Sequence, residues 1–318
     1  MSFLKEEYPE LMWDGKEKLP IVVSFGAGVD STAILVRMWK EDIKPDHILF
    51  ADTGAERPDI YAHIERVNKW CDKVGFPNVT KLVYRDKNGE DYNLLQSLEK
   101  NNTMPSLAFG FKSCSIQFKI KPQRQYIESL GVDKVINIVG YGVGEIDRAI
   151  KGLESYKKEL SETKEVKCKM VLSFPLIEWK LNRDDCKKLS RSIGFCTSKS
   201  ACFFCPSMPL SSIVKLRDHY PELYNKSIEI ERNYNKKFRA IHKERTDLAI
   251  KEFGEDWEEV DIKYFKEKNL KKPKPFNIVG LSREKSWEDR MREYDYLPPE
   301  LPFMEQFGVD MGCGCTDF

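Results

Sequence analysis

A turn rich in small residues, between residues 24 and 31, has the side chains and the setting of an anion site. The segment SFGAGVDS follows the apolar run IVV and precedes a stretch of helical composition. Such a turn leaves backbone N–H groups unpaired at the positive end of the next helix, where phosphate binds well. Its small and hydroxyl-bearing residues are Ser24, Gly26, Gly28 and Ser31. Asp30 could hold Mg²⁺ or orient an attacking group. Taken alone, the turn would also serve as a plain tight connection.

The cysteines suggest a second kind of chemistry. Cys202 and Cys205 have the C-x-x-C spacing that lets two thiolates bind one metal ion or cluster. The chain has nine cysteines, an odd number, and we expect it in the reducing cytosol, so a disulfide framework is disfavoured. Cys71 and Cys168 have no partner spacing and are most simply buried thiols.

The composition is that of an ordinary globular chain. It has 318 residues, of which 41% are hydrophobic, so it can bury a full core. Lys and Arg number 52 against 51 Asp and Glu, and the formal net charge is +1. A polyanionic partner would therefore need a local basic patch. We find neither a signal-peptide pattern nor a run long enough to span a membrane, and we expect a cytoplasmic protein without a membrane partner.

The elements that would position the turn alternate between strand and helix. Short β-rich runs occur at residues 21–25, 47–52, 80–84, 134–141 and 169–174. Helical patterns occur between them, at about 30–41, 58–74, 91–100 and 116–130. This alternation predicts an α/β fold with a doubly wound, mostly parallel sheet. Ligands of such folds bind outside the carboxyl ends of the strands, where the turn would lie.

The chain changes character after this part. We expect a nucleotide-binding α/β domain over residues 1–180 and a mainly helical region over 181–296 that contains the C-x-x-C site. Asn182 could cap a helix through RDDCKKLSRSI. The Pro- and Gly-rich residues 297–318 have the composition of a flexible tail.

Four segments carry a resemblance to a known family. SFGAGVDST resembles the S-G-G-x-D-S pyrophosphate loop of the adenine nucleotide α-hydrolase-like (PP-loop ATP pyrophosphatase) superfamily, in the branch related to phosphoadenosine phosphosulfate (PAPS) reductase. FADTGAERPDIY resembles the motif of its second strand, CSIQFKIKP its Cys-x(4)-Lys-x-x-Pro stretch, and SACFFCPSMP its Cys-x-x-Cys-Pro segment. The likeness covers roughly residues 20–230. It implies a Rossmann-like fold that binds adenine nucleotide.

The resemblance implies residue roles. The nucleotide, ATP or an adenylyl sulfate, would be bound by Ser24, Phe25, Gly26, Gly28, Asp30, Ser31, Asp52, Thr53 and Arg148. Asp52 is placed for a ribose or Mg²⁺ contact. Arg148 would bind phosphate or pair with Asp147, and both alternatives stay open. Asp30 and Lys119 would take part in catalysis, and Lys112, Lys121 and Arg124 would flank Lys119 as further cations or as a solvated face.

The same resemblance implies a cysteine-ligated centre. Its ligands would be Cys114, Cys186, Cys202 and Cys205, around a 4Fe-4S cluster. Cys196 competes with Cys186 for the last position, and structural Zn²⁺ is the alternative to the cluster. In the tail, Cys313 and Cys315 resemble the mobile C-terminal nucleophile of PAPS reductases in position but not in surrounding sequence. They are either catalytic thiols or incidental cysteines at a free end.

One detail of the turn separates two chemistries. Sulfonucleotide reductases of the family commonly depart from the Asp-Ser ending of the loop, whereas this chain keeps Asp30 and Ser31. The expected activity is therefore ATP-dependent, adenylating sulfur transfer. It would need a sulfur donor or thiol reductant and a nucleic-acid or small-molecule acceptor. The alternatives are reduction of an adenylyl sulfate to sulfite, and a non-enzymatic nucleotide-binding module with structural zinc.

Overall fold

The chain folds into two compact units in the computed structural model. The structure describes residues 3–163, 166–196, 199–274, 280–283 and 285–296. Within these, the first unit comprises residues 3–94 and 115–202, and the second comprises residues 95–114 and 203–296. Each unit is described by itself.

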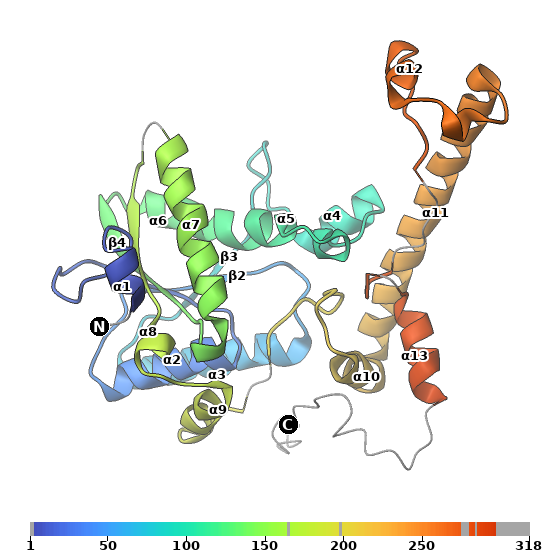
Figure 1. Cartoon of the computed structure of the whole chain (residues 1–318). Helices are drawn as coiled ribbons and strands as arrows, with labels where there is room; N and C mark the ends of the chain where they lie inside the picture. The colour runs from blue at the N-terminus through green and yellow to red at the C-terminus, as the bar shows by residue number, and fades with distance from the viewer. Residues whose placement is uncertain (1–2, 164–165, 197–198, 275–279, 284, 297–318) are drawn as a thin grey trace. The chain divides into compact units, whose positions relative to one another are not determined.

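A parallel sheet of five strands forms the centre of the first unit (Figure 1). Its order is β3-β2-β1-β4-β5, and every printed pairing between neighbours is parallel. The strands are β1 (Ile21–Ser24), β2 (His47–Ala51), β3 (Val79–Leu82), β4 (Lys134–Val139) and β5 (Lys169–Ser173). All five lie within a residue or two of the predicted runs. Strands β1, β2, β4 and β5 bury residues at successive positions, as covered parallel strands do, whereas the edge strand β3 has no buried residue.

Helices cover both faces of this sheet, which confirms the predicted doubly wound α/β fold. One face packs against α2 (Val29–Lys40), α3 (Pro58–Val74) and α9 (Arg183–Arg191). The other face packs against α1 (Phe3–Glu7), α6 (Lys121–Ser129) and α7 (Ile146–Glu162). Neighbouring strand residues alternate between the faces, so Val22 lies in the second core and Val23 in the first.

The strand order reverses beside β1. The chain runs from β1 to β2 and β3 on one side and then returns to β4 and β5 on the other. In open parallel sheets, ligands bind where the strand order reverses, outside the carboxyl ends of the strands. Here that position lies between β1 and β4, whose pairing ends at Ser24 and Val139. The turn of residues 24–31 begins there.

Helix α9 belongs to the first unit. Its start is fixed by the predicted cap: the Asn182 side chain accepts hydrogen bonds from Asp184 N and Asp185 N, and the Asp185 side chain completes a capping box. Cys186 is fully buried in the core that α9 shares with α2. The chain therefore passes into the second unit after Cys202, whereas we expected the helical region from residue 181; the domain limits stay a prediction.

The second unit is helical. Its elements are α4 (Leu94–Asn101), η1 (Ser106–Phe109), α10 (Leu210–His219), α11 (Pro221–Phe253), η4 (Trp257–Glu259), α12 (Ile262–Glu267) and α13 (Trp287–Asp295), with α5 (Ser113–Ser115) at its junction with the first unit. Glu231 on α11 is 2% exposed, and its carboxylate accepts hydrogen bonds from Leu281 N and Trp287 N. This carboxylate holds the start of α13 against α11.

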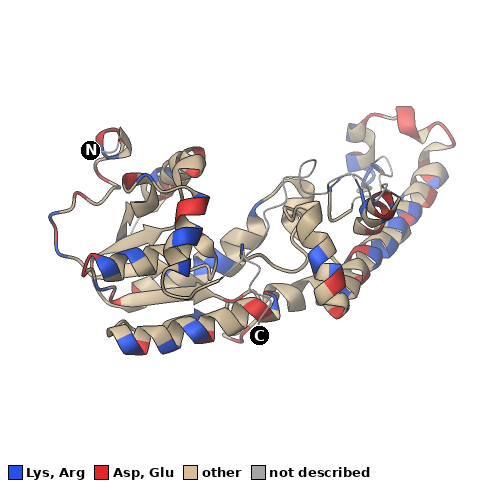
Figure 2. Ribbon diagram, turned by 90° about the horizontal axis from the view of Figure 1, so that it is seen from below, with Lys and Arg blue, Asp and Glu red and all other residues tan. Residues whose placement is uncertain are grey.

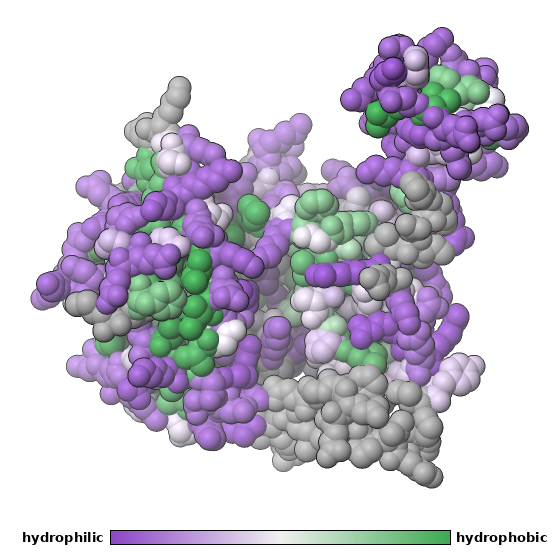
Figure 3. Space-filling view, viewed as in Figure 1, coloured by the Kyte–Doolittle hydropathy of each residue, from purple (hydrophilic) through white to green (hydrophobic). Residues whose placement is uncertain are grey.

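Charged residues of both signs are interspersed over the described surface. Figure 2 shows both basic and acidic residues along α11. Hydrophilic side chains also cover most of the face of the first unit seen in Figure 3. Among the described residues, no helix combines the length and the apolar character needed to cross a membrane.

Candidate functional site

The turn after β1 has an open backbone at the start of a helix. Gly28 is the N-cap of α2 in an extended conformation, and Ala27 before it has a left-handed φ of 54° that non-glycine residues seldom adopt. Phe25 is buried and anchors the turn in the core. Among the described residues, the N–H groups of Gly26 and Gly28 meet no acceptor. The turn therefore presents free donors at a helix N-terminus, as an anion site requires.

Asp30 lies in the first turn of α2 and faces α9. Its carboxylate oxygen is 3.0 Å from Arg183 Nη1, and its side chain is 16% exposed. Burial raises the pKa of Asp30, while Arg183 and a hydrogen bond from the Cys186 thiol lower it. Asp30 is thus a half-buried acid held by a cation. Sequence reasoning missed Arg183, because nothing local marks it as the partner of a residue on another helix.

The two serines of the turn have different surroundings. Ser24 Oγ lies 2.7 Å from Gln123 Oε1 and 2.9 Å from Asn137 Oδ1, so protein groups already engage it. Ser31 is buried, and its hydroxyl donates to Gly28 O at 3.3 Å. Both stay predicted nucleotide contacts, and Ser31 lies nearer to the free donors.

Ser200, from the loop before the C-x-x-C segment, lies over the turn. A Cβ atom on Gly28 would come within 3.1 Å of Ser200 Oγ and 3.3 Å of Ser200 N, and one on Gly26 within 3.7 Å of Ser200 Oγ. Hydroxyl and amide donors are thus added to those of the turn. No motif of the sequence indicated this contact.

The residues that follow the carboxyl end of β2 carry the second motif, FADTGAERPDIY. Asp52 is 5% exposed and accepts hydrogen bonds from Gly54 N at 2.8 Å, from the Tyr61 hydroxyl at 2.7 Å and from Lys81 Nζ at 2.6 Å. Three donors therefore already occupy the carboxylate predicted to bind ribose or Mg²⁺. Burial and the hydrogen bond to Asp52 raise the pKa of Tyr61 far above its ordinary value.

Thr53 connects this motif to the cysteine segment. It is fully buried, and its Oγ1 lies 3.2 Å from Cys202 Sγ. The structure thus brings two predicted site residues together, one from the nucleotide motif and one from the C-x-x-C pair.

Lys119, the predicted catalytic lysine, lies beside the same motif. Its Nζ is 3.3 Å from Glu56 Oε1, and 38% of its side chain is exposed. Glu56 is 4% exposed, and sequence reasoning gave it no role.

The residues after the carboxyl end of β4 include Arg148, a predicted nucleotide contact. The Arg148 guanidinium contacts the Glu145 carboxylate and lies 4.8 Å from the centre of the Tyr141 ring. The partner is thus Glu145 rather than the Asp147 considered from the sequence. Gly140 packs closely on α2, since a Cβ there would lie 3.5 Å from Ser31 N.

The predicted metal ligands are divided between the units. Cys186 and Cys202 lie in the first unit, and Cys114 and Cys205 in the second. Among the described residues, no three His, Cys, Asp or Glu side chains form a group that could hold a metal ion. Cys205 Sγ lies 3.1 Å from Ser207 Oγ. The Cys₄ set stays a prediction.

Cys186 has a protein environment of its own. It is fully buried, and burial together with Asp30 raises the pKa of its thiol to about 12. Cys196, the competing ligand, is only partly buried, and the choice between it and Cys186 stays a prediction. Cys71 and Cys168 are buried thiols, as predicted. Cys313 and Cys315 lie outside the described residues.

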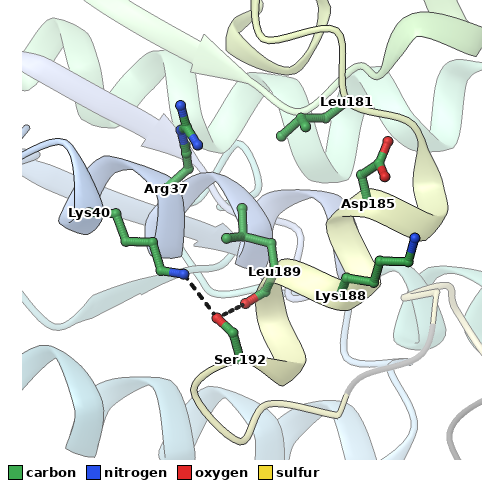
Figure 4. Close-up of a pocket in the computed structure, with 7 residues that line it drawn as sticks. All are labelled: Arg37, Lys40, Leu181, Asp185, Lys188, Leu189 and Ser192. Carbon is green, nitrogen blue, oxygen red and sulfur yellow. Dashed lines mark hydrogen bonds between the residues drawn. The ribbon is translucent and has the colours of Figure 1, made fainter.

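A cavity of about 330 Å³ lies between α2 and α9, away from the turn (Figure 4). It is lined by Arg37, Lys40, Leu181, Asp185, Lys188, Leu189 and Ser192. Lys40 Nζ donates to Ser192 Oγ at 3.1 Å. Its cations lie toward the C-terminal ends of their helices, where they neutralise the helix dipole. None of the predicted site residues lines this cavity.

The chain has low sequence identity to the known proteins that it resembles. No protein-family model matches the sequence. A curated protein of Methanocaldococcus jannaschii, described as uncharacterized, is 26% identical over 250 residues, which cover 74% of this chain. The match spans 45% of that protein, so this chain corresponds to less than half of its length.

Among solved structures, the U34-tRNA thiolase NcsA from Methanococcus maripaludis, with its 4Fe-4S cluster, is similar at a TM-score of 0.38 and 16% identity. The likeness covers 74% of this chain and 78% of that one. A TM-score below 0.5 gives this likeness no weight for fold or chemistry.

Proposed function

We propose that this chain is a PP-loop enzyme that cleaves ATP to adenylate an acceptor and then supports sulfur transfer to it. The observation that carries the proposal is the turn of residues 24–31. It joins free backbone donors, a helix start and an acid paired with Arg183 where the strand order reverses between β1 and β4. The motif resemblance of the turn and of residues 50–61 supplies the nucleotide class.

In the proposed reaction, residues of the turn bind the phosphates of ATP and the Mg²⁺ ion, and two displacement steps follow. The N–H groups of Gly26 and Gly28 would bind the β- and γ-phosphates, with Ser31 and Ser200 adding hydroxyl donors. Asp30 would hold Mg²⁺, which neutralises charge that develops on the phosphates. An acceptor oxygen attacks the α-phosphorus, the bond to the bridging oxygen breaks, and pyrophosphate leaves. A sulfur nucleophile then attacks the acceptor carbon that bears the adenylated oxygen, the bond between this carbon and oxygen breaks, and AMP leaves with the oxygen.

A cysteine-ligated centre is part of the proposal. Cys114, Cys202 and Cys205 would hold a 4Fe-4S cluster together with Cys186 or Cys196. Cys186 is buried and Cys196 is partly buried, and both alternatives stay open for the fourth ligand. Such a cluster would bind the sulfur to be transferred. Structural Zn²⁺ predicts instead a colourless protein with stoichiometric zinc, so iron, sulfide and zinc analysis of anaerobically purified protein separates the two.

The primary test is pyrophosphate release. Purified protein is incubated with ATP and Mg²⁺ in the presence of candidate acceptors, and pyrophosphate and AMP are measured. We expect Asp30→Ala to abolish release. Asp184→Asn is the matched control, because Asp184 is an exposed carboxylate that pairs with Lys187 at the start of α9. Absence of pyrophosphate and AMP with every acceptor, despite ATP binding, would contradict the proposal.

Two further outcomes identify the alternatives. Sulfite release from an adenylyl sulfate and a thiol reductant would identify a sulfonucleotide reductase. Tight nucleotide binding without any turnover would identify a binding module. Comparison of modified nucleosides and small metabolites in cells with and without the protein would identify the acceptor.

A further inference from the structure

Two structural irregularities converge on one side chain, that of Lys119. The first is Glu56, whose side chain is 1% exposed and whose Oε1 lies 3.3 Å from Lys119 Nζ. Its other oxygen, Oε2, is buried and has no hydrogen-bond partner among the described residues. A buried carboxylate with one unsatisfied oxygen destabilises a fold, since removing a charge from water is offset only by full pairing. Stability therefore does not explain Glu56.

The second irregularity is the backbone that carries Lys119. Residues Ile116–Ile120 form a turn of π-helix, η2, before α6, and Lys121 N donates to Ile116 O, five residues back. π-Turns are rare because their packing is poorer than that of an α-helix, and they are frequent at functional sites.

Pro122 gives the π-turn a cause. It is buried in the first turn of α6, and it has no N–H to donate to the carbonyl of Phe118 four residues back. Its ring would also clash with that carbonyl in a regular α-helix. The ring of Phe118, 3% exposed, packs edge-on against Tyr84 at 5.4 Å and anchors the turn. The Lys-x-x-Pro spacing therefore has a physical consequence. Pro122 induces the π-turn, and the π-turn sets the direction in which the Lys119 side chain extends from the helix.

We propose that Glu56 and Pro122 are positioning residues that hold the Lys119 ammonium beside the carboxyl end of β2, where it binds an anionic group of the substrate. This inference rests on the function proposed above. Glu56 fixes the ammonium through charge, and Pro122 fixes it through the backbone. Of the Lys119 side chain, 38% is exposed.

The test compares Glu56→Gln and Pro122→Ala with Asp91→Asn. Asp91 forms a carboxylate–arginine pair with Arg85 in which both side chains are mostly exposed, so its variant controls for loss of an acid in the same unit. We expect the first two variants to lower kcat for pyrophosphate release roughly tenfold to a hundredfold, since a misplacement of about 1 Å can cost two orders of magnitude. Their urea-unfolding midpoints should equal or exceed that of the wild type. Asp91→Asn should match the wild type in both.

A second measurement does not depend on turnover. Acetylation of Lys119 by a limiting amine-reactive reagent is followed by peptide mass spectrometry, with Lys16 as an internal reference. In Glu56→Gln we expect Lys119 to react roughly two- to fivefold faster, because the carboxylate no longer holds the nitrogen in its protonated, ion-paired form, and only the amine reacts. A wild type without ATP cleavage, but with this change in labelling, would refute the proposed function and leave the positioning intact. Unchanged Lys119 labelling, or turnover lost only in proportion to stability, would overturn the positioning proposal.

Discussion

At the scale of single residues, the turn after β1 has little spare space. Gly28 has a φ of −99°, which any residue can adopt, so its value lies in the absence of a side chain. A methyl group there would meet Ser200 Oγ at 3.1 Å and Ser200 N at 3.3 Å. Because a backbone atom is one of the two, the loop of residue 200 would have to shift.

We therefore expect Gly28→Ala to weaken ATP binding at least about tenfold, which corresponds to about 1.4 kcal/mol. Isothermal titration calorimetry with ATP measures it. Gly152→Ala is the control: Gly152 lies inside α7, and an added Cβ meets nothing within 4 Å. That variant should bind ATP normally and gain roughly 0.5–1 kcal/mol of unfolding free energy. Equal affinity of the two variants would contradict the close approach at Gly28.

His63 predicts a pH dependence of the first unit. It is 1% exposed, its Nε2 lies 2.9 Å from Thr32 Oγ1, and burial lowers its pKa from 6.5 to about 4. Between these values the unfolded chain takes up a proton that the folded chain does not. The contribution of neutral His63 to the unfolding free energy should therefore be fully present above pH 6.5. It should be lost as the pH falls toward 4, by about 3 kcal/mol in all. The difference between wild type and His63→Gln in urea unfolding from pH 7 to pH 4 measures this contribution. A constant difference would refute it.

At the scale of elements, the capping box of α9 supports the acid of the turn, because α9 carries Arg183 directly after its cap. Asn182→Ala removes the acceptor for Asp184 N and Asp185 N. We expect a loss of about 1 kcal/mol in unfolding free energy. Asn182→Ser should restore most of it, since serine also caps well. Chemical denaturation of both variants is the measurement, and equal losses would show that the cap itself contributes nothing.

The sequence predicted the elements whose apolar pattern was strong and failed where it was weak. All five strands and the helices at α2 and α3 were predicted. Four of the strands and both helices bury several apolar residues, whereas the edge strand β3 buries none. Helix α7 was missed because it buries only Ala149, Leu153 and Tyr156 among charged residues. The π-turn was missed because the prediction was a helix over about residues 116–130, and no pattern in it indicated the five-residue bond from Lys121 N to Ile116 O.

The sequence predicted the parts of the candidate site that are local in the chain, but not the contacts between distant segments. The turn and the residues of its motif could be identified from local sequence. Arg183, Ser200 and Glu56 could not, since each meets its partner only after the sheet has brought distant segments together. Physical chemistry supplies the reason for each contact afterwards, but no periodicity or spacing encodes it beforehand.

At the scale of the whole molecule, the two units should respond to pH in opposite directions. In the second unit, burial raises the pKa of Glu231 from 4.5 to about 7, against the lowering effect of its bonds from Leu281 and Trp287. The folded state holds this proton more tightly than the unfolded state. The contribution of protonated Glu231 to the unfolding free energy is fully present below pH 4.5. It is lost as the pH rises through 7, by about 3 kcal/mol.

Hydrogen exchange resolved by peptide measures this response at pH 5 and pH 8, after correction for intrinsic exchange rates. Protection of α11 and α13 should be lower at pH 8 in the wild type. In Glu231→Gln the protection should no longer change with pH, whatever its absolute level. A pH response of the variant equal to that of the wild type would assign it to other groups.

The division of the chain into units has a consequence for how the protein can be cut. The second unit takes residues 95–114 from the middle of the first, between β3 and β4, and the rest from beyond Cys202. A fragment that ends at residue 180 or 202 would therefore keep α4 and η1 without the helices they belong with. During synthesis, β1 likewise obtains its second neighbour only when β4 emerges, far later in the chain. The turn after β1 therefore acquires its neighbouring strand β4 and the overlying Ser200 only after the intervening segments have been synthesised.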